Sequence, residues 1–184
     1  PGAGAAAQAT TGIVCTYRGR LFRTYYSACC GGTTLSGAAV FGDECLALGS
    51  VTCGGCDDAP LFRWERVASD PTALDRVART RAPSFRSLRS ASTIERLNAP
   101  GLVSVSDGRR TVQLTATEVK SALGLPSLMY KLTSDGDGVV AHGRGHGHGV
   151  GLCQWGAKGL AEQGYTAEQI LKHYYPGSAL TRLP

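Results

Sequence analysis

The residues best placed to do chemistry lie between positions 143 and 157, where the chain reads GRGHGHGVGLCQWGA. Glycine occupies every second position from 143 to 151, which excludes a stable helix and makes a poor ordinary strand. Such spacing lets the backbone approach another backbone or a ligand closely. In an extended chain, alternation places Arg144, His146 and His148 on one side. The pattern therefore predicts a shaped binding site without saying what it binds.

Cysteines form the second group with chemical potential. The chain has seven, and the Cys53-x-x-Cys56 knuckle together with Cys30 offers three thiolates. Cys29 or a histidine would complete a tetrahedral zinc site, and knuckle spacing favours a metal. Cys29 and Cys30 are adjacent and cannot both easily bind one ion. An oxidising compartment would instead allow disulfides, and free thiols are the third alternative.

Length and composition limit the classes of protein. A chain of 184 residues, 42% hydrophobic and 18% charged, is long enough for one folded domain with a hydrophobic core. The net charge of +5 suits approach to a polyanionic surface such as a cell wall, although ordinary solvated surface charge explains it equally. Without a block of like charge or basic–aromatic interleaving, nucleic acid is not expected as a partner.

Neither a transmembrane segment nor a signal peptide is visible in the sequence. The apolar runs are far too short to span a membrane. The chain opens with PGAGAAA, without an initiating methionine or a basic region. We therefore expect it to be part of a longer gene product.

Two β-hairpins are predicted from turn residues between β-branched and aromatic runs. Arg18-Gly19 separates residues 12–17 from 21–26, and Asp107-Gly108 separates 103–105 from 111–114. Residues 35–60 are predicted to be loop, and the Arg- and Ser-rich stretch 79–92 to be flexible.

Three short helices are predicted from capping signals. One begins with Asp70 as N-cap and Pro71 at the first helical position. Capping boxes at 115–118 and 166–169 open the other two, which end at Gly124 and before Pro176. The expected fold class is α+β, with early β-hairpins and a small mixed sheet with short helices. Residues 1–9 are expected to be a frayed lead-in, and residues 10–184 a single domain.

Residues 147–157, GHGVGLCQWGA, and 170–177, ILKHYYPG, resemble the closing signature of the SpoIID/LytB family. This family comprises the stage II sporulation protein D and amidase-enhancer proteins. Residues 26–34, YSACCGGTT, are similar to the end of the family's strand pair, and residues 110–128 to its strand, helix and Leu-Gly-Leu passage. The resemblance runs over most of residues 10–180.

The resemblance implies a lytic transglycosylase that acts on strands of N-acetylmuramic acid and N-acetylglucosamine stripped of their stem peptides. A single carboxylic acid protonates the glycosidic oxygen, and the muramic acid C6 hydroxyl closes on C1. In the family this acid is a Glu in an Ala-rich helix before the first hairpin. No glutamate of this chain has that context, so we expect the catalytic residue to be absent, and whether the chain is an enzyme stays open. The glutamates are Glu44, Glu65, Glu95, Glu118, Glu162 and Glu168.

The resemblance also indicates which residues would contact substrate. His148 is the first candidate, with Gln154 as a donor to sugar groups and Trp155 as a stacking surface. Arg144 and His146 join them from the glycine-rich segment. Ordinary structural roles are the competing interpretation: a histidine bonded to the loop backbone, a loop anchor and a core tryptophan.

Family members with cysteines at matching places resemble zinc binders, which implies structural zinc held by Cys30, Cys53, Cys56 and Cys29. The implied partners are peptidoglycan glycan strands and a cell-wall amidase, and the implied location is extracytoplasmic: cell wall, periplasm or spore septum. A non-catalytic peptidoglycan-binding module that enhances an amidase is the main alternative. A metallohydrolase using His142, His146 and His148 is disfavoured, because these residues lack the helical pairing of common zinc proteases.

Overall fold

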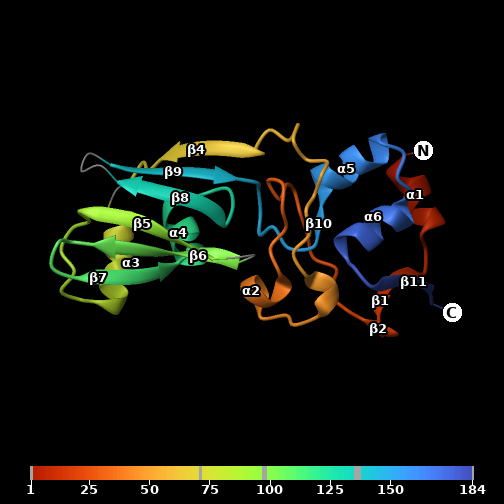
Figure 1. The fold of residues 1–184 in the computed structure, drawn as a ribbon, viewed down its shortest axis with the longest axis horizontal. Helices are drawn as coiled ribbons and strands as arrows, with labels where there is room; N and C mark the ends of the chain where they lie inside the picture. Colours follow the sequence, from red (N-terminus) through yellow and green to blue (C-terminus); the bar gives the residue numbers. More distant parts are fainter. Residues whose placement is uncertain (1, 71, 97–98, 135–137, 184) are drawn as a thin grey trace.

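The computed structural model describes residues 2–70, 72–96, 99–134 and 138–183, which form two lobes side by side (Figure 1). Residues 63–144 make a sheet lobe. Residues 2–62 and 145–183 make a terminal lobe that holds both ends of the chain. Buried side chains of both lobes belong to one hydrophobic cluster. The chain therefore leaves the terminal lobe once, builds the sheet lobe, and returns directly into the glycine-rich segment.

The terminal lobe is built around strands from both ends of the chain. Strand β1 (Ile13–Tyr17) pairs antiparallel with β11 (Ser178–Arg182) on one side and with β2 (Arg20–Leu21) on the other. The predicted turn is confirmed, since Arg18 and Gly19 both take positive φ, 51° and 73°. The second strand is much shorter than predicted, because the chain then turns away to form β3.

Strand β3 (Tyr26–Ser27) pairs in parallel with β10 (Leu152–Cys153), which joins the early chain to the far end of the glycine-rich segment. The helices of this lobe are short. They are α1 (Ala3–Ala9), α2 (Gly37–Phe41), the 3₁₀ turn η1 (Leu46–Leu48), α5 (Gln154–Glu162) and α6 (Ala167–Tyr174). Residues 3–9, expected to be a frayed lead-in, form a helix with no buried side chain.

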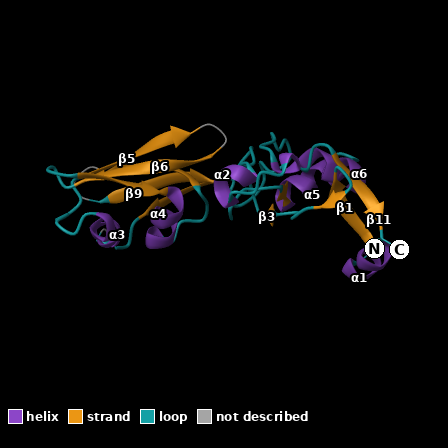
Figure 2. Ribbon diagram, turned by 90° about the horizontal axis from the view of Figure 1, so that it is seen from below, coloured by secondary structure: helices purple, strands orange, loops and turns teal. Residues whose placement is uncertain are grey.

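The sheet lobe contains two three-stranded antiparallel sheets, ordered β4-β9-β8 and β5-β6-β7. The strands are β4 (Arg63–Val67), β5 (Ser90–Arg96), β6 (Ala99–Ser106), β7 (Thr111–Thr115), β8 (Met129–Ser134) and β9 (Val139–Arg144). Strand β5 lies beside β8, where Leu132 N donates to Thr93 Oγ1 at 2.9 Å. Helices α3 (Ala73–Arg81) and α4 (Ala116–Leu123) cover one face of the strands (Figure 2).

Alternation along the strands explains this one-sided packing. Val103 and Val105 on β6, with Val112 and Leu114 on β7, are buried, while residues between them on β7 are exposed. The hairpin predicted around Asp107-Gly108 is confirmed, and Asp107 Oδ1 accepts from the backbone N–H groups of Arg109 and Arg110. The mixture of helices and antiparallel sheets confirms the α+β class.

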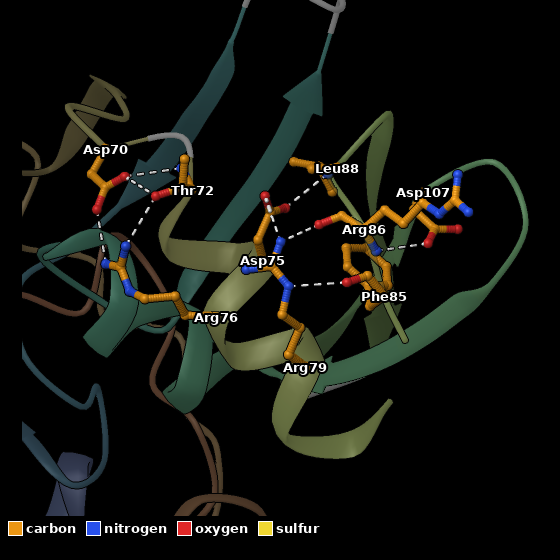
Figure 3. A network of polar contacts seen from close by, with 9 residues as sticks. All are labelled: Asp70, Thr72, Asp75, Arg76, Arg79, Phe85, Arg86, Leu88 and Asp107. Atoms are coloured by element: carbon orange, nitrogen blue, oxygen red, sulfur yellow. Dashed lines mark hydrogen bonds and ion pairs between the residues drawn. The ribbon is translucent and has the colours of Figure 1, made fainter. Parts of the chain in front are cut away.

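Residues 79–92, expected to be flexible, belong to α3 at one end and to β5 at the other. Carboxylates hold the connection between them (Figure 3): Asp75 Oδ1 accepts from Leu88 N at 2.8 Å, and Asp107 Oδ2 from Arg86 N at 2.9 Å. Arg79 Nε donates to Phe85 O at 3.0 Å. These bonds hold the connection in a fixed position along α3. The prediction that this stretch is flexible is therefore not supported.

Both capping boxes are confirmed, at Thr115–Glu118 and Thr166–Gln169. The predicted helix start near Asp70 is displaced, because Thr72 is the N-cap and α3 begins at Ala73. Asp70 Oδ1 instead accepts from Thr72 N at 2.9 Å (Figure 3). Pro71, predicted at the first helical position, lies outside the described residues. Among the described helices, none has the length and apolar character needed to cross a membrane.

Candidate functional site: the glycine-rich segment and the cysteine cluster

Close backbone contacts hold the glycine-rich segment against residues 25–35. His146 N donates to Cys29 O at 2.7 Å, Leu35 N to Gly149 O at 2.8 Å, and Leu152 N to Tyr25 O at 3.0 Å. Gly151 has a φ of +70°, and a Cβ there would lie 2.1 Å from Tyr25 O. Only glycine permits this approach, which is why the sequence alternates glycine with functional side chains.

Positive φ at all four glycines from 145 to 151 breaks the strand geometry that alternation assumes. The expectation that Arg144, His146 and His148 share one side is therefore wrong. Arg144 lines a groove beside β4 and β8, His146 is exposed next to Cys29, and His148 packs against aromatic rings.

His148 is the centre of an aromatic platform, formed by Tyr25, Phe41 and His148. The rings of Tyr25 and Phe41 stack with centroids 4.5 Å apart, and the His148 ring meets them edge-on, 6.0 and 5.0 Å away. Phe41 keeps 45% of its surface exposed. The platform therefore presents apolar ring surface to solvent beside a polar ring.

The backbone fixes the protonation state of His148. Its Nδ1 accepts from Val150 N at 3.0 Å, so the proton of the neutral ring is on Nε2. Burial lowers the pKa of His148 below 6.5, partly opposed by a hydrogen bond with the Tyr26 backbone. The residue is thus a neutral imidazole at pH 7.

Gln154 and Trp155 lie elsewhere in the site. Gln154 is exposed at the start of α5 and lines an apolar cavity of about 620 Å³ together with Tyr26. Trp155 is half-buried, its backbone N donates to Ala28 O at 3.1 Å, and Lys158 Nζ lies 5.4 Å from its ring centroid. The five predicted substrate-binding residues therefore lie along the glycine-rich segment but do not share one pocket.

Sequence reasoning missed Tyr25 and Phe41. Tyr25 stood in a predicted strand, and Phe41 in a predicted loop. A signal for α2 was present, since Ser36 Oγ accepts from Ala39 N at 3.2 Å and Gly42 takes a left-handed C-cap. That helix places Phe41 at its last position, against Tyr25.

The metallohydrolase alternative is not supported. His142 Nδ1 lies 3.2 Å from a Glu65 carboxylate oxygen on the sheet lobe, whereas His148 packs against Tyr25 and Phe41 of the terminal lobe. Across the described residues, the one group of at least three potential ligands within reach of a metal ion consists of cysteines.

That cysteine cluster contains Cys30, Cys53, Cys56 and Cys153, all buried, with the four Sγ atoms within 4.8 Å of one another. Cys153 takes the place that the sequence suggested for Cys29, which is buried outside the group with its Sγ accepting from Gly31 N at 3.4 Å. The alternation of neighbouring side chains explains this: Cys30 and Cys29 point to opposite sides of the chain, so only one reaches the cluster.

The cluster geometry suits a tetrahedral ion. A Zn–S distance of 2.3 Å puts ligand sulfurs about 3.8 Å apart, and Cys30 Sγ lies 3.8 Å from Cys56 Sγ. All seven cysteines are among the described residues, and no disulfide joins any two of them.

The electrostatics of the cluster also favour a bound metal ion. Hydrogen bonds from Cys153 and Cys30 lower the pKa of Cys53, and Tyr174 Oη approaches its Sγ at 2.9 Å. Burial and the neighbouring Cys53 charge raise the pKa of Cys56. The pocket thus favours ionisation of Cys53 and disfavours ionisation of Cys56. A divalent cation would remove this conflict, because it neutralises several thiolates together. The donor set fits zinc, and four protein ligands leave no open position, which is typical of a structural site.

Hydrogen bonds connect the segments that carry the cysteine cluster and the aromatic platform. Cys30 N donates to Cys153 Sγ at 3.3 Å, linking the chain after β3 to the chain after the glycine-rich segment. On the other side, Tyr175 Oη donates to Tyr25 O at 2.7 Å. A bound ion would therefore hold together the segments that carry Tyr25 and His148.

The glutamates have other roles. Four form ion pairs: Glu95 with Lys131, Glu118 with Arg81, Glu162 with Lys158, and Glu168 with Lys172. A Glu65 carboxylate oxygen lies 3.2 Å from His142 Nδ1. The hydrogen bond from Lys131 lowers the pKa of Glu95. Burial raises that of Glu118, but bonds from Thr115 and the charge of Arg81 lower it overall. Glu44 is exposed. A general acid needs a raised pKa, so Glu95 and Glu118 do not suit that role.

The chain is similar in sequence to several known proteins. No family model matches the chain. An uncharacterized protein of Brachyspira hyodysenteriae is 32% identical over 165 residues, 89% of this chain and 44% of that protein. Stage II sporulation protein D of Bacillus amyloliquefaciens is 27% identical over 173 residues, 91% of this chain and 47% of that protein. The amidase enhancer of Bacillus subtilis is 36% identical over 74 residues, 39% of this chain and 10% of that protein. The chain spans about half the length of the first two relatives.

Proposed function

This chain is a homologue of the SpoIID/LytB proteins, and we propose that it forms the glycan-binding part of a domain that processes peptidoglycan glycan strands. The observation that carries the proposal is the aromatic platform of Tyr25, Phe41 and His148. Exposed ring faces bind the apolar faces of sugars, and a neutral imidazole beside them supplies a directed hydrogen-bond donor. One platform residue, His148, lies on the segment whose sequence resembles the family signature.

The reaction we assign to the complete domain is lytic transglycosylation of denuded N-acetylmuramic acid–N-acetylglucosamine strands. The substrate supplies its own nucleophile, the C6 hydroxyl of muramic acid, so one carboxylic acid is sufficient. The role of this chain is to bind and orient the strand. None of its glutamates is assigned as the acid, because four are in ion pairs and two of these have lowered pKa values.

The same observation favours a second candidate, a non-catalytic peptidoglycan-binding module that enhances a cell-wall amidase. Such a module needs the platform but no acid. Both functions place the protein outside the cytoplasm, at the cell wall, in the periplasm or at the spore septum, with glycan strands as partner.

We further propose that Cys30, Cys53, Cys56 and Cys153 hold a structural zinc ion. Its contribution would be to cross-link the segments behind the platform, and with four thiolate ligands it would take no part in the chemistry. Gly156 permits this arrangement, because a Cβ there would lie 2.2 Å from Cys53 Sγ.

Binding of a soluble, denuded tetrasaccharide by calorimetry tests the proposal. We expect Phe41→Ala to weaken binding by roughly three- to tenfold, the loss of one aromatic stacking contact. Tyr165→Ala removes a ring of similar exposure, 48%, from the loop before α6 and is the matched control. Equal effects of the two substitutions, or no binding by the unmodified chain, would refute the platform.

Digestion of denuded peptidoglycan separates the two candidate functions. Anhydro-muramic ends formed by the complete domain identify the transglycosylase. Strand binding without such ends, combined with a faster partner amidase, identifies the binding module. Anhydro ends formed by these 184 residues alone would show that one of the six glutamates, or another group in the chain, acts as the acid.

A further inference from the structure

A cavity of about 1030 Å³ lies outside the aromatic platform. It is a groove on the sheet lobe, lined by parts of β4, β5, β8 and β9 and by the Gly31-Gly32 turn of the terminal lobe. It reaches the platform's segment through Met129, whose Cε would lie 3.4 Å from a Cβ at Gly149, the residue after His148.

Cross-strand pairing shows which side chains face away from the helices. Tyr130 Oη donates to Ala116 O, at the start of α4, so Tyr130 and its neighbours on β9 and β4 face that helix. The adjacent row, Arg63, Arg144 and Met129, must face the opposite side. Helices α3 and α4 leave that side uncovered (Figure 2).

Basic side chains outnumber carboxylates in the groove. Four basic residues, Arg63, Arg96, Lys131 and Arg144, line it with two carboxylates, Glu65 and Glu95. Glu65 is paired with His142, and Glu95 with Lys131 at 2.7 Å. Over the described part of the chain, Arg63, Arg96 and Arg144 have no ion pair.

Arg63 and Arg144 lie directly opposite each other on β4 and β9. Two like charges in this position destabilise a sheet unless something neutralises them. The stem of Arg144 is packed in place, since a Cβ at Gly31 would lie 2.7 Å from its Cβ. Arg63 lies over the Phe62 ring, 5.9 Å from its centroid. The stems of both residues thus contact the protein, and among the described residues neither guanidinium is in an ion pair, although the charge of Arg144 lowers the pKa of Glu95. Two such guanidinium groups side by side suit an anionic oxygen pair.

Resting on the function proposed above, we propose that Arg63 and Arg144 bind the free carboxylate of the lactyl group of N-acetylmuramic acid. That carboxylate is free only where the stem peptide has been removed, because the peptide is joined to it as an amide. The arginine pair would thus make the chain select denuded strands. A phosphodiester polymer fits less well, since its repeated charges would meet Glu65 and Glu95 beside the arginines.

The test compares one tetrasaccharide of alternating N-acetylglucosamine and N-acetylmuramic acid in two forms, with free lactyl carboxylates and with the same groups converted to methylamides. We expect the unmodified protein to bind the carboxylate form at least about tenfold more tightly, as charged hydrogen bonds allow. Arg63→Gln and Arg144→Gln should each remove most of this preference, by weakening binding of the carboxylate form far more than binding of the methylamide form.

Arg66→Gln is the control. Arg66 is exposed on the same strand but belongs to the row that faces the other side of the sheet. Equal loss in Arg66→Gln would mean that only net charge matters, and would overturn the inference. So would equal binding of both forms by the unmodified protein, which leaves the proposed function intact. A glycerol-phosphate polymer that binds more tightly than the carboxylate form, in an arginine-dependent way, would overturn it in favour of that ligand. Failure of both saccharides to bind would reject the proposed function together with the inference.

Discussion

His148 matters through its tautomer as much as through its position. Because Nδ1 accepts from Val150 N, this nitrogen is not available to take a proton from substrate, and Nε2–H is the hydrogen-bond donor of the neutral ring. The ring packs against Tyr25 and Phe41, which excludes water from much of its surface. These contacts favour a binding role for the residue over the role of a general base.

The lowered pKa of His148 makes the stability of the protein depend on pH. An unfolded histidine binds a proton near 6.5, but the folded residue resists it, because burial opposes the charge and protonated Nδ1 can no longer accept from Val150. The unfolded state therefore binds more protons once the pH falls below about 6.5. We expect the free energy of unfolding to decrease between pH 7.5 and 5.5, and to decrease less in His148→Asn.

Urea unfolding at the two pH values provides the measurement. The comparison with His148→Asn isolates this residue from the other three histidines, which both proteins share. An identical decrease in both proteins would show that His148 contributes nothing to the pH dependence.

At the scale of elements, the features predicted correctly from the sequence are those that depend on neighbouring residues. The turns at Arg18-Gly19 and Asp107-Gly108 and the two capping boxes depend on a few adjacent residues, and all four are present. The fourth member of the cysteine cluster could not be predicted in the same way. Cys153 is separated from Cys30 by 123 residues, and long-range contacts such as the parallel pairing of β3 with β10 bring them together.

Helix α5 was not predicted for a related reason. Its sequence, QWGAKGLAE, contains two glycines, which are poor helix formers. The fold needs both. A Cβ at Gly156 would lie 2.0 Å from Tyr174 Oη, and one at Gly159 would lie 2.2 Å from Gly55 O. Packing of α5 against α6 and the cysteine knuckle therefore overrides helix propensity here.

This packing reverses the usual effect of replacing glycine in a helix. Gly→Ala within a helix normally stabilises by up to about 1 kcal/mol. We expect Gly156→Ala to lower the free energy of unfolding by about 2 kcal/mol instead, because the added methyl overpacks Tyr174 and Cys53. Gly4→Ala in α1 makes the same chemical change with nothing within 4 Å, and should not destabilise. Chemical denaturation of both variants measures the difference, and stabilisation by Gly156→Ala would contradict the packing of α5.

At the scale of the whole molecule, the chain is held together across long sequence separations. β1 pairs with β11, β3 with β10, and the cysteine cluster gathers four ligands from three separate stretches of chain. The sheet lobe is inserted between these stretches, so the alignment of the platform depends on contacts that close a loop of about a hundred residues. Closing such a loop costs conformational entropy, which a metal cross-link offsets.

Zinc binding should therefore depend on Cys153 and not on Cys29. We expect the unmodified protein, purified under reducing conditions, to hold about one zinc ion per chain. Cys29→Ser should retain it, since that thiol lies outside the cluster, whereas Cys153→Ser should lose most of it. Loss of a structural ion removes several kcal/mol, so a chelator should lower the melting temperature of the unmodified protein and of Cys29→Ser by roughly 10 °C. The same chelator should leave the melting temperature of Cys153→Ser nearly unchanged.

Elemental analysis measures the zinc content, and thermal melting measures the effect of the chelator. Zinc retained by Cys153→Ser and lost from Cys29→Ser would assign the fourth ligand to Cys29, and a zinc-free unmodified protein would favour disulfides or free thiols.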